Sequence, residues 1–188
     1  MLKQSKSKLE KIIYDRYGSK KGFLRFMSHS FLARVGAYRH YQGLVPRADQ
    51  RVVFICSGNI CRSPLAEYYA RSVGIDAYSC GLDCGVGFPA DPRAAEIGKE
   101  LDLDLRSHQT KRVDQFDFLP DDLIVVMEPK HVKKFKQQVG NQHKIVLAGL
   151  CCPDPFPYLH DPYNCNASYF RHCETFVLSS VRRLCGKK

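Results

Sequence analysis

A cysteine and an arginine lie at the two ends of one short segment, residues 56–64, which reads Cys-Ser-Gly-Asn-Ile-Cys-Arg-Ser-Pro. A cysteine thiolate is a strong nucleophile, and a guanidinium binds two oxygens of a phosphoryl group at once. We therefore expect Cys56 to attack phosphorus while Arg62 holds the phosphate. A lone cysteine at the end of a strand is more commonly structural. Here Gly58, Asn59 and Ser63 at these offsets favour the catalytic interpretation.

The elements on either side of this segment must turn it into a loop. The apolar run before Cys56 predicts a buried strand at 51–56, and Ser63-Pro64 predicts a helix entry, with the Ser63 hydroxyl as cap and the proline in the first turn. Asn59 tolerates a left-handed backbone. The amides of the loop then point inward and form an anion cradle. The predicted phosphate-binding residues are Ser57, Gly58, Asn59, Ile60, Cys61, Arg62 and Ser63.

The rest of the chain alternates apolar runs with helical patterns, which is typical of an α/β fold with a parallel sheet. We expect strands at 51–56, 75–80, 123–127 and 144–148, and helices at 63–74, from Asp91-Pro92 onward, at 130–138 and at 168–184. Ligands of such sheets bind beyond the carboxyl ends of the strands. The cysteine loop follows the first strand and therefore lies where a site is expected.

Residues 56–64 resemble the signature loop of the low-molecular-weight protein tyrosine phosphatases. The similarity runs in the family's order over residues 50–186 and includes Asp91-Pro92-Arg93-Ala94, Ser107-His108 and Asp161-Pro162-Tyr163. It implies a three-layer α/β fold, in which helices flank a four-stranded parallel sheet. It also implies hydrolysis of phosphotyrosine and small aryl phosphates through a cysteinyl-phosphate, without cofactor or metal. We expect this catalytic domain at 50–188 and a basic, helical N-terminal extension at 1–49.

Three Asp-Pro pairs compete for the role of general acid, and local pattern does not choose between them. The resemblance assigns the role to Asp161, in the loop before the last helix. Asp91 is better explained as a helix cap and Asp154 as a turn residue. The predicted catalytic residues are thus Cys56, Arg62 and Asp161.

The resemblance also suggests which residues support the loop and which line the substrate cleft. Asn59, Ser63 and His108 are expected to support the loop, although a purely structural role explains His108 equally well. Tyr163 and Phe88 are expected in the cleft. Where many family members carry an aromatic residue before Asp91-Pro92, this chain has Cys84, so selectivity for aryl phosphates is less firmly predicted than phosphatase activity.

The cysteines indicate a reducing compartment. Their number, nine, is odd, and no zinc-type spacing occurs. No segment resembles a membrane span or a secretory signal, and we therefore expect a cytoplasmic protein. Cys61 either forms a reversible disulfide with Cys56 or simply packs under the loop; the sequence leaves both open.

The charge of the chain is concentrated at its start, because residues 1–50 hold 11 Lys/Arg and 3 Asp/Glu, a net charge of +8 out of +10 overall. Five apolar residues recur there at helical spacing: Phe23, Leu24, Met27, Phe31 and Val35. We expect this stripe to dock on its own domain. The alternative is contact with an acidic partner or a membrane surface; a nucleic-acid partner is not expected.

Two other functions are compatible with parts of this pattern. An arsenate reductase of the same fold needs further cysteines, which residues 125–140 lack. A catalytically silent phosphoprotein-binding module would not need Cys56, Arg62 and Asp161 together. The expected partner is therefore a phosphotyrosine-containing protein, such as a tyrosine kinase.

Overall fold

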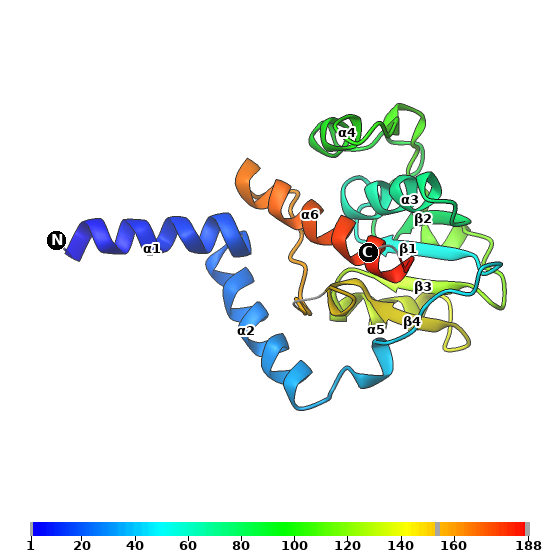
Figure 1. The fold of residues 1–188 in the computed structure, drawn as a ribbon, viewed down its shortest axis with the longest axis horizontal. Helices are drawn as coiled ribbons and strands as arrows, with labels where there is room; N and C mark the ends of the chain where they lie inside the picture. Colours follow the sequence, from blue (N-terminus) through cyan, green and yellow to red (C-terminus); the bar gives the residue numbers. More distant parts are fainter. Residues whose placement is uncertain (1, 153–154, 187–188) are drawn as a thin grey trace.

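The protein is described from a computed structural model, covering residues 2–152 and 155–186. Its centre is a four-stranded parallel sheet in the order β2-β1-β3-β4 (Figure 1). The strands are β1 (Val52–Cys56), β2 (Ala77–Gly81), β3 (Leu123–Val126) and β4 (Lys144–Leu147). Strands β1 and β3 are buried along their whole length. This explains why they appear in the sequence as unbroken apolar runs.

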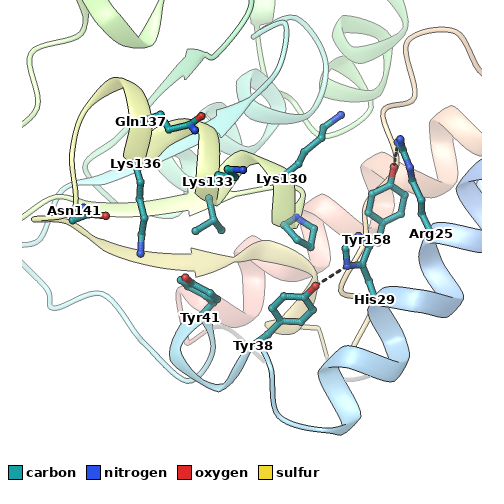
Figure 2. Close-up of a pocket in the computed structure, with 12 residues that line it drawn as sticks. Arg25, His29, Tyr38, Tyr41, Lys130, Lys133, Lys136, Gln137, Asn141 and Tyr158 are labelled. Atoms are coloured by element: carbon teal, nitrogen blue, oxygen red, sulfur yellow. Dashed lines mark hydrogen bonds between the residues drawn. The ribbon is translucent and has the colours of Figure 1, made fainter.

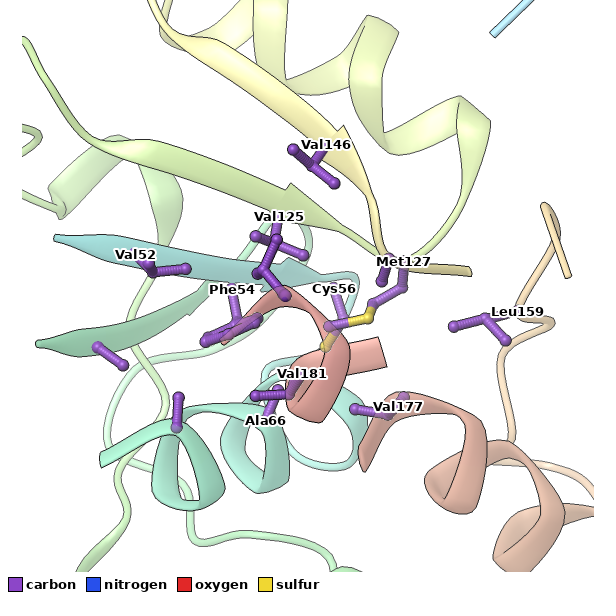
Figure 3. Packing of buried hydrophobic residues seen from close by; sticks show 14 of the residues in the cluster. Val52, Phe54, Cys56, Ala66, Val125, Met127, Val146, Leu159, Val177 and Val181 are labelled. Carbon is purple, nitrogen blue, oxygen red and sulfur yellow. The ribbon is translucent and has the colours of Figure 1, made fainter. Parts of the chain in front are cut away.

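Helices cover both faces of the sheet, as predicted. They are α3 (Arg62–Ser72), α5 (Pro129–Gln138) and α6 (Ala167–Leu184), and a further helix, α4 (Pro92–Lys99), packs on α3 and α6. Short 3-10 turns lie at Leu105–Ser107, Val113–Gln115 and Ala148–Leu150. Ala66 of α3 and Val181 of α6 meet Phe54 on one face (Figure 3). Val132 and Phe135 of α5 pack on the other face. The observed strand and helix bounds lie within two residues of those predicted.

The connection between β1 and α3 is the segment that carries Cys56 and Arg62. Since β1 is central and neighbours both β2 and β3, the loop at its carboxyl end meets the loops that follow those strands. Helix α4 begins after Asp91, whose side chain accepts a hydrogen bond of 2.9 Å from the Arg93 backbone nitrogen. The cap predicted for Asp91 is therefore confirmed. Asp154 lies outside the described residues.

The N-terminal part forms two helices, α1 (Leu2–Tyr17) and α2 (Lys20–Arg34), and a 3-10 turn at Arg39–Tyr41. Ser19 caps α2 by accepting a 2.8 Å hydrogen bond from the Gly22 nitrogen. Figure 1 shows α1 projecting away from the sheet while α2 turns off at its end. No helix among the described residues has both the length and the apolar character needed to cross a bilayer.

The predicted docking face of α2 is wrong. Four of the five stripe residues, Leu24, Met27, Phe31 and Val35, are between 52% and 67% exposed. The helix docks instead through a neighbouring face: the Phe26 ring stacks on Phe156 with centroids 4.3 Å apart, and the His29 ring stacks on Tyr158 at 5.2 Å. Aromatic partners from the loop before α6 thus decide the orientation of α2.

Candidate active site

The loop after β1 curls around the sulfur of Cys56. Asn59 has φ of 51°, in the left-handed region, which turns the backbone back on itself. Its backbone nitrogen donates to the Cys56 Sγ at 3.2 Å, and the Ser63 hydroxyl lies 3.0 Å from the same sulfur. The buried sulfur therefore lies at the end of β1 within hydrogen-bonding distance of a backbone amide and a hydroxyl.

The expected cap by Ser63 is wrong. Helix α3 begins at Arg62, one residue earlier than predicted, its N-cap position is Cys61, and no side chain caps it. The Ser63 oxygen instead accepts a 3.0 Å hydrogen bond from the side-chain nitrogen of Asn59. Its own hydrogen is then free to point at the Cys56 sulfur.

Asn59 is fixed by a buried network. Its side-chain nitrogen also donates to the Ser79 hydroxyl at 2.8 Å, and its side-chain oxygen accepts from the Lys111 backbone nitrogen at 2.9 Å. Ser79 in turn donates to Glu67 at 2.6 Å. His108 Nε2 donates to the Asn59 carbonyl at 2.8 Å, and burial lowers the pKa of His108, so its ring is neutral at pH 7. Hydrogen bonds thereby fix both the side chain and the backbone carbonyl of Asn59.

Arg62 is buried and uses its two edges differently. One terminal nitrogen, Nη1, donates to Glu128 at 2.9 Å and to the Leu159 carbonyl at 2.8 Å. The other, Nη2, lies 3.0 Å from the Asp161 carboxylate. The Nε nitrogen has no hydrogen-bond partner among the described residues. The edge formed by Nε and Nη2 therefore has donor capacity for two oxygens of an anion.

Glu128 and His131 belong to the site and were missed from the sequence. Burial opposes ionisation of Glu128, but the charge of Arg62 overrides it and lowers the pKa of this carboxyl to about 2. Burial also lowers the pKa of His131 to about 3, and its neutral ring lies 3.1 Å from the Ser57 hydroxyl. Glu128 directly follows the expected strand 123–127, and this position beyond a central strand was the available signal.

Asp161, the second carboxylate that contacts Arg62, comes from the loop before α6. Its oxygen accepts a 3.2 Å hydrogen bond from the Tyr163 backbone nitrogen, which closes the Asp-Pro-Tyr turn. A cavity of about 210 Å³ is lined by Cys56, Ser57, Gly58, Ile60, Cys61, Arg62, Asp83, Asp161 and Tyr163. Residues from the loop after β1 and from the loop before α6 therefore line the same small cavity.

Phe88 and Tyr163, the predicted cleft residues, line a second cavity, which shares Gly58, Ile60, Asp83 and Tyr163 with the first. It measures about 420 Å³ and includes Gly58, Ile60, Cys84, Phe88 and Tyr163. Phe88 and Tyr163 are exposed, at 59% and 53%. Their rings are available to an incoming group, and Cys84 lines the same cavity.

The two loop cysteines, Cys56 and Cys61, are free thiols in the structure. Cys61 is buried within the loop, and burial raises the pKa of its thiol. Among residues 2–152 and 155–186, no group of three His, Cys, Asp or Glu side chains has an arrangement that could hold a metal ion.

The fold is a four-stranded parallel sheet with Cys56 and Arg62 in the connection after the central strand β1. Residues 51–188 match the family described as low molecular weight phosphotyrosine protein phosphatase. The chain belongs to this family and is a hydrolase of that class. The predicted family and fold are therefore confirmed.

The matching relatives come from bacteria and eukaryotes. The chain is 30% identical over 135 residues to the low molecular weight protein-tyrosine-phosphatase Wzb of Escherichia coli (strain K12), covering 70% of this chain and 90% of the relative. It is 30% identical over 141 residues to the low molecular weight phosphotyrosine protein phosphatase of Sus scrofa, covering 68% and 88%.

Solved structures agree with the family assignment. Vibrio vulnificus Wzb in complex with benzylphosphonate is 26% identical, with a TM-score of 0.63, over 73% of this chain and 97% of that one. None of these matches favours the arsenate reductase or the silent binding module. Residues 1–50 lie outside the family match.

Proposed function

We propose that this protein hydrolyses phosphotyrosine in proteins, and small aryl phosphates, through a cysteinyl-phosphate intermediate, with residues 50–188 as the catalytic domain. One observation carries the proposal: Cys56, Arg62 and Asp161 line the same small cavity. These are a nucleophile, a two-point phosphate ligand and a proton donor, which together suffice for hydrolysis of a monoester.

In the first step, the Cys56 thiolate attacks phosphorus in line with the leaving oxygen. The sulfur–phosphorus bond forms as the phosphorus–oxygen bond breaks, and protonated Asp161 gives its proton to the departing tyrosine oxygen. Charge on the other phosphoryl oxygens is stabilised by the loop amides and Arg62. Ser63 and the Asn59 amide support this step, because both contact the sulfur.

In the second step, water attacks the cysteinyl-phosphate. Asp161, now ionised, takes a proton from the water as its oxygen bonds to phosphorus. The sulfur–phosphorus bond breaks, and the thiolate of Cys56 returns with release of inorganic phosphate.

The substrate is proposed to be a phosphotyrosine-containing protein, such as a tyrosine kinase. The exposed rings of Tyr163 and Phe88 provide apolar walls for a phenol ring. The family relative Wzb of Vibrio vulnificus was solved with an aryl compound, benzylphosphonate. This likeness supports an aryl group in the cleft.

Two variants test the roles of the nucleophile and the acid. Cys56→Ser is expected to lose turnover of p-nitrophenyl phosphate while still binding orthophosphate. Asp161→Asn is expected to bind phosphate and to slow phenyl phosphate, a poor leaving group, more than p-nitrophenyl phosphate. Equal rates for Asp161→Asn and the parent on phenyl phosphate would refute the assignment of the acid.

We also propose that Cys61 protects Cys56 from over-oxidation. Peroxide would oxidise the Cys56 thiolate to a sulfenic acid, and the Cys61 thiol would condense with it, releasing water and forming a disulfide. Both sulfurs belong to residues that line one cavity. Mass mapping of the 56–61 peptide after peroxide treatment tests the idea; a sulfinic acid at Cys56 without a crosslink contradicts it. The free thiols of Cys56, Cys61, Cys80 and Cys84 support a reducing, cytoplasmic location.

The N-terminal extension, residues 1–49, is proposed to contact an anionic membrane surface through α2. The exposed stripe of Leu24, Met27, Phe31 and Val35 lies on one side of this helix. The surrounding charge is strongly positive, since residues 1–50 carry a net +8. An apolar strip flanked by cations matches the interface of an anionic bilayer.

Vesicle flotation tests this contact. The parent is expected to float with vesicles containing phosphatidylglycerol and not with pure phosphatidylcholine. The double variant Leu24→Ser/Phe31→Ser is expected to stay in solution, while the control Leu119→Ser, which also replaces an exposed leucine, still floats. If the parent is instead a dimer that the double variant dissociates, the membrane proposal is wrong.

A further inference from the structure

A larger cavity, of about 820 Å³, lies between the N-terminal extension and helix α5. Figure 2 shows Arg25, His29, Tyr38 and Tyr41 on one side of it and the lysines of α5 on the other. The family match begins at residue 51. One wall of this space therefore comes entirely from outside the matched catalytic domain.

The charge of this cavity is entirely positive. Arg25, Lys130, Lys133 and Lys136 line it, and no Asp or Glu is among the lining residues. In the part of the chain that the structure describes, neither Lys133 nor Lys136 forms an ion pair with a carboxylate; the Lys136 ammonium lies 5.6 Å from the centre of the Tyr41 ring. Two cations thus face the space without a compensating charge, and a ligand bearing negative charge would be attracted.

The arrangement of these cations favours an extended ligand. Lys130, Lys133 and Lys136 follow each other every third residue along α5, so their backbone positions span about 9 Å at 1.5 Å per residue. A single compact phosphate contacts only one part of such a row. An acidic peptide in extended conformation rises about 3.3 Å per residue and presents every second side chain on one face, so alternate carboxylates can lie along the row.

Tyrosines complete the lining. The Tyr38 hydroxyl forms a 2.6 Å hydrogen bond with His29 Nδ1, and the Tyr158 hydroxyl accepts a 3.0 Å hydrogen bond from Arg25. Their rings, with that of Tyr41, offer apolar surface between the cations. Such alternation of rings and charges suits a peptide, which carries both carboxylates and apolar stems.

The cavity is connected to the candidate active site through two residues. Lys130 lies 3.1 Å from Glu128, the carboxylate that binds Arg62. Tyr158 precedes Asp161 by three positions, and its hydroxyl lies 3.1 Å from His160 Nδ1. The amino end of α5 thus adjoins the site, and the row of lysines leads away from it.

We propose that this basic groove, lined by Arg25, Lys130, Lys133, Lys136 and the three tyrosines, binds an acidic segment of the phosphoprotein whose phosphotyrosine enters the active site. The inference rests on the proposed function for the identity of the ligand. It makes the N-terminal extension a determinant of substrate choice, because Arg25, Tyr38 and Tyr41 complete the groove.

Steady-state kinetics with two phosphotyrosine peptides test the groove, one flanked by glutamates and one by glutamines. The variant Lys133→Gln/Lys136→Gln is expected to lose between about two- and thirtyfold in kcat/KM on the glutamate peptide, through KM, since each exposed charge contributes modestly. The glutamine peptide and p-nitrophenyl phosphate should be turned over as by the parent, which also shows that the variant is folded. The control Lys99→Gln/Lys144→Gln removes the same charge from exposed positions outside the groove.

A binding measurement separates this inference from the proposed function. Fluorescence anisotropy of a labelled hexaglutamate peptide needs no turnover, and binding should weaken in the groove variant and not in the control. If the parent hydrolyses no phosphotyrosine peptide, the proposed function fails while hexaglutamate still tests the groove. Equal hexaglutamate binding by parent, groove variant and control overturns the inference, as does an equal kinetic loss on both peptides.

Discussion

Replacing Glu128 by glutamine removes the charge that holds Arg62 while keeping the size of the side chain. Glu128 is fully buried, and its oxygen accepts from the Arg62 Nη1 at 2.9 Å. In Glu128→Gln, the Arg62 guanidinium retains one carboxylate partner, Asp161 at 3.0 Å. We expect a less stable protein with weaker phosphate binding, because a buried positive charge loses one of its two carboxylate partners.

The size of the effect follows from the titration of Glu128. Its pKa falls from the ordinary 4.5 to about 2, and each pKa unit corresponds to about 1.4 kcal/mol, which gives roughly 3 kcal/mol. Breaking a buried ion pair typically costs about 3–5 kcal/mol. The two figures agree, and for a chain of this length they correspond to a fall of roughly 6–12 °C in melting temperature.

The dependence on pH has a definite sign. The pKa of Glu128 is lower in the folded chain than in the unfolded chain, so its contribution to the free energy of unfolding is complete above about pH 4.5. It is lost as the pH falls toward about 2. The difference in stability between the parent and Glu128→Gln should therefore be constant near neutrality and shrink below pH 4.5.

Urea denaturation and inhibition by orthophosphate measure the two effects. The control is Lys130→Gln, which removes the exposed partner of the same carboxylate, 3.1 Å away and 55% exposed. It should cost less than about 1 kcal/mol. If Glu128→Gln unfolds at the same urea concentration as the parent and is inhibited by the same phosphate concentration, then Glu128 does not hold Arg62 as described.

Three further substitutions probe neighbouring parts of the site. Arg62→Lys keeps the charge but loses the planar fork, so kcat on p-nitrophenyl phosphate should fall by at least about a hundredfold; a rate within tenfold of the parent contradicts two-point binding. Gly81→Ala would bring a Cβ to 2.9 Å from the Ser57 carbonyl and 3.0 Å from the Asn59 Cβ, so we expect a loss of about 1–3 kcal/mol in urea denaturation and a higher KM; unchanged values would show that the loop can shift freely. Glu174 is buried, and burial raises its pKa to about 8, so the carboxyl is protonated at pH 7. The parent should therefore lose stability at roughly 1.4 kcal/mol per pH unit as the pH rises from about 4.5 toward 8. Glu174→Gln should lack this loss, and parallel profiles of stability against pH for the two proteins would show that Glu174 does not have a raised pKa.

The sheet could be predicted because its signals are local. Strands β1 and β3 are buried on both faces, so each is a short unbroken apolar run that ends at a polar or turn residue. Asp91 and Pro92 mark the start of α4 in the same local way. Nothing distant in the sequence is needed to recognise these elements.

The supports of Arg62 could not be predicted in this way. Glu128 and Leu159 lie far from Arg62 in the chain, and they meet it because β3 pairs with β1 and the loop before α6 folds over the same edge. The local pattern predicted that the guanidinium is a phosphate ligand. It held no information about which guanidinium nitrogen, here Nη1, donates its hydrogen bonds to other parts of the protein.

Helix α2 shows the same limit at the level of a whole element. Its periodicity correctly predicted a helix, but the predicted stripe did not include Phe26. The ring that Phe26 stacks on, Phe156, lies in a segment without regular structure. A ring in a neighbouring loop thus outweighed the more regular apolar stripe. Periodicity predicts that a helix has a face to bury, and the tertiary partner determines which one.

The contacts of Arg62 with the acid loop explain how one residue can serve the fold and the chemistry together. The guanidinium holds this loop twice, through the Leu159 carbonyl at Nη1 and through the Asp161 carboxylate at Nη2. Only the second contact competes with a phosphoryl oxygen. We expect a phosphate at the edge formed by Nε and Nη2 to displace the Asp161 Oδ2 contact and to leave the backbone contact at Leu159 in place. The loop would then keep its position while this carboxylate oxygen becomes available to the leaving oxygen.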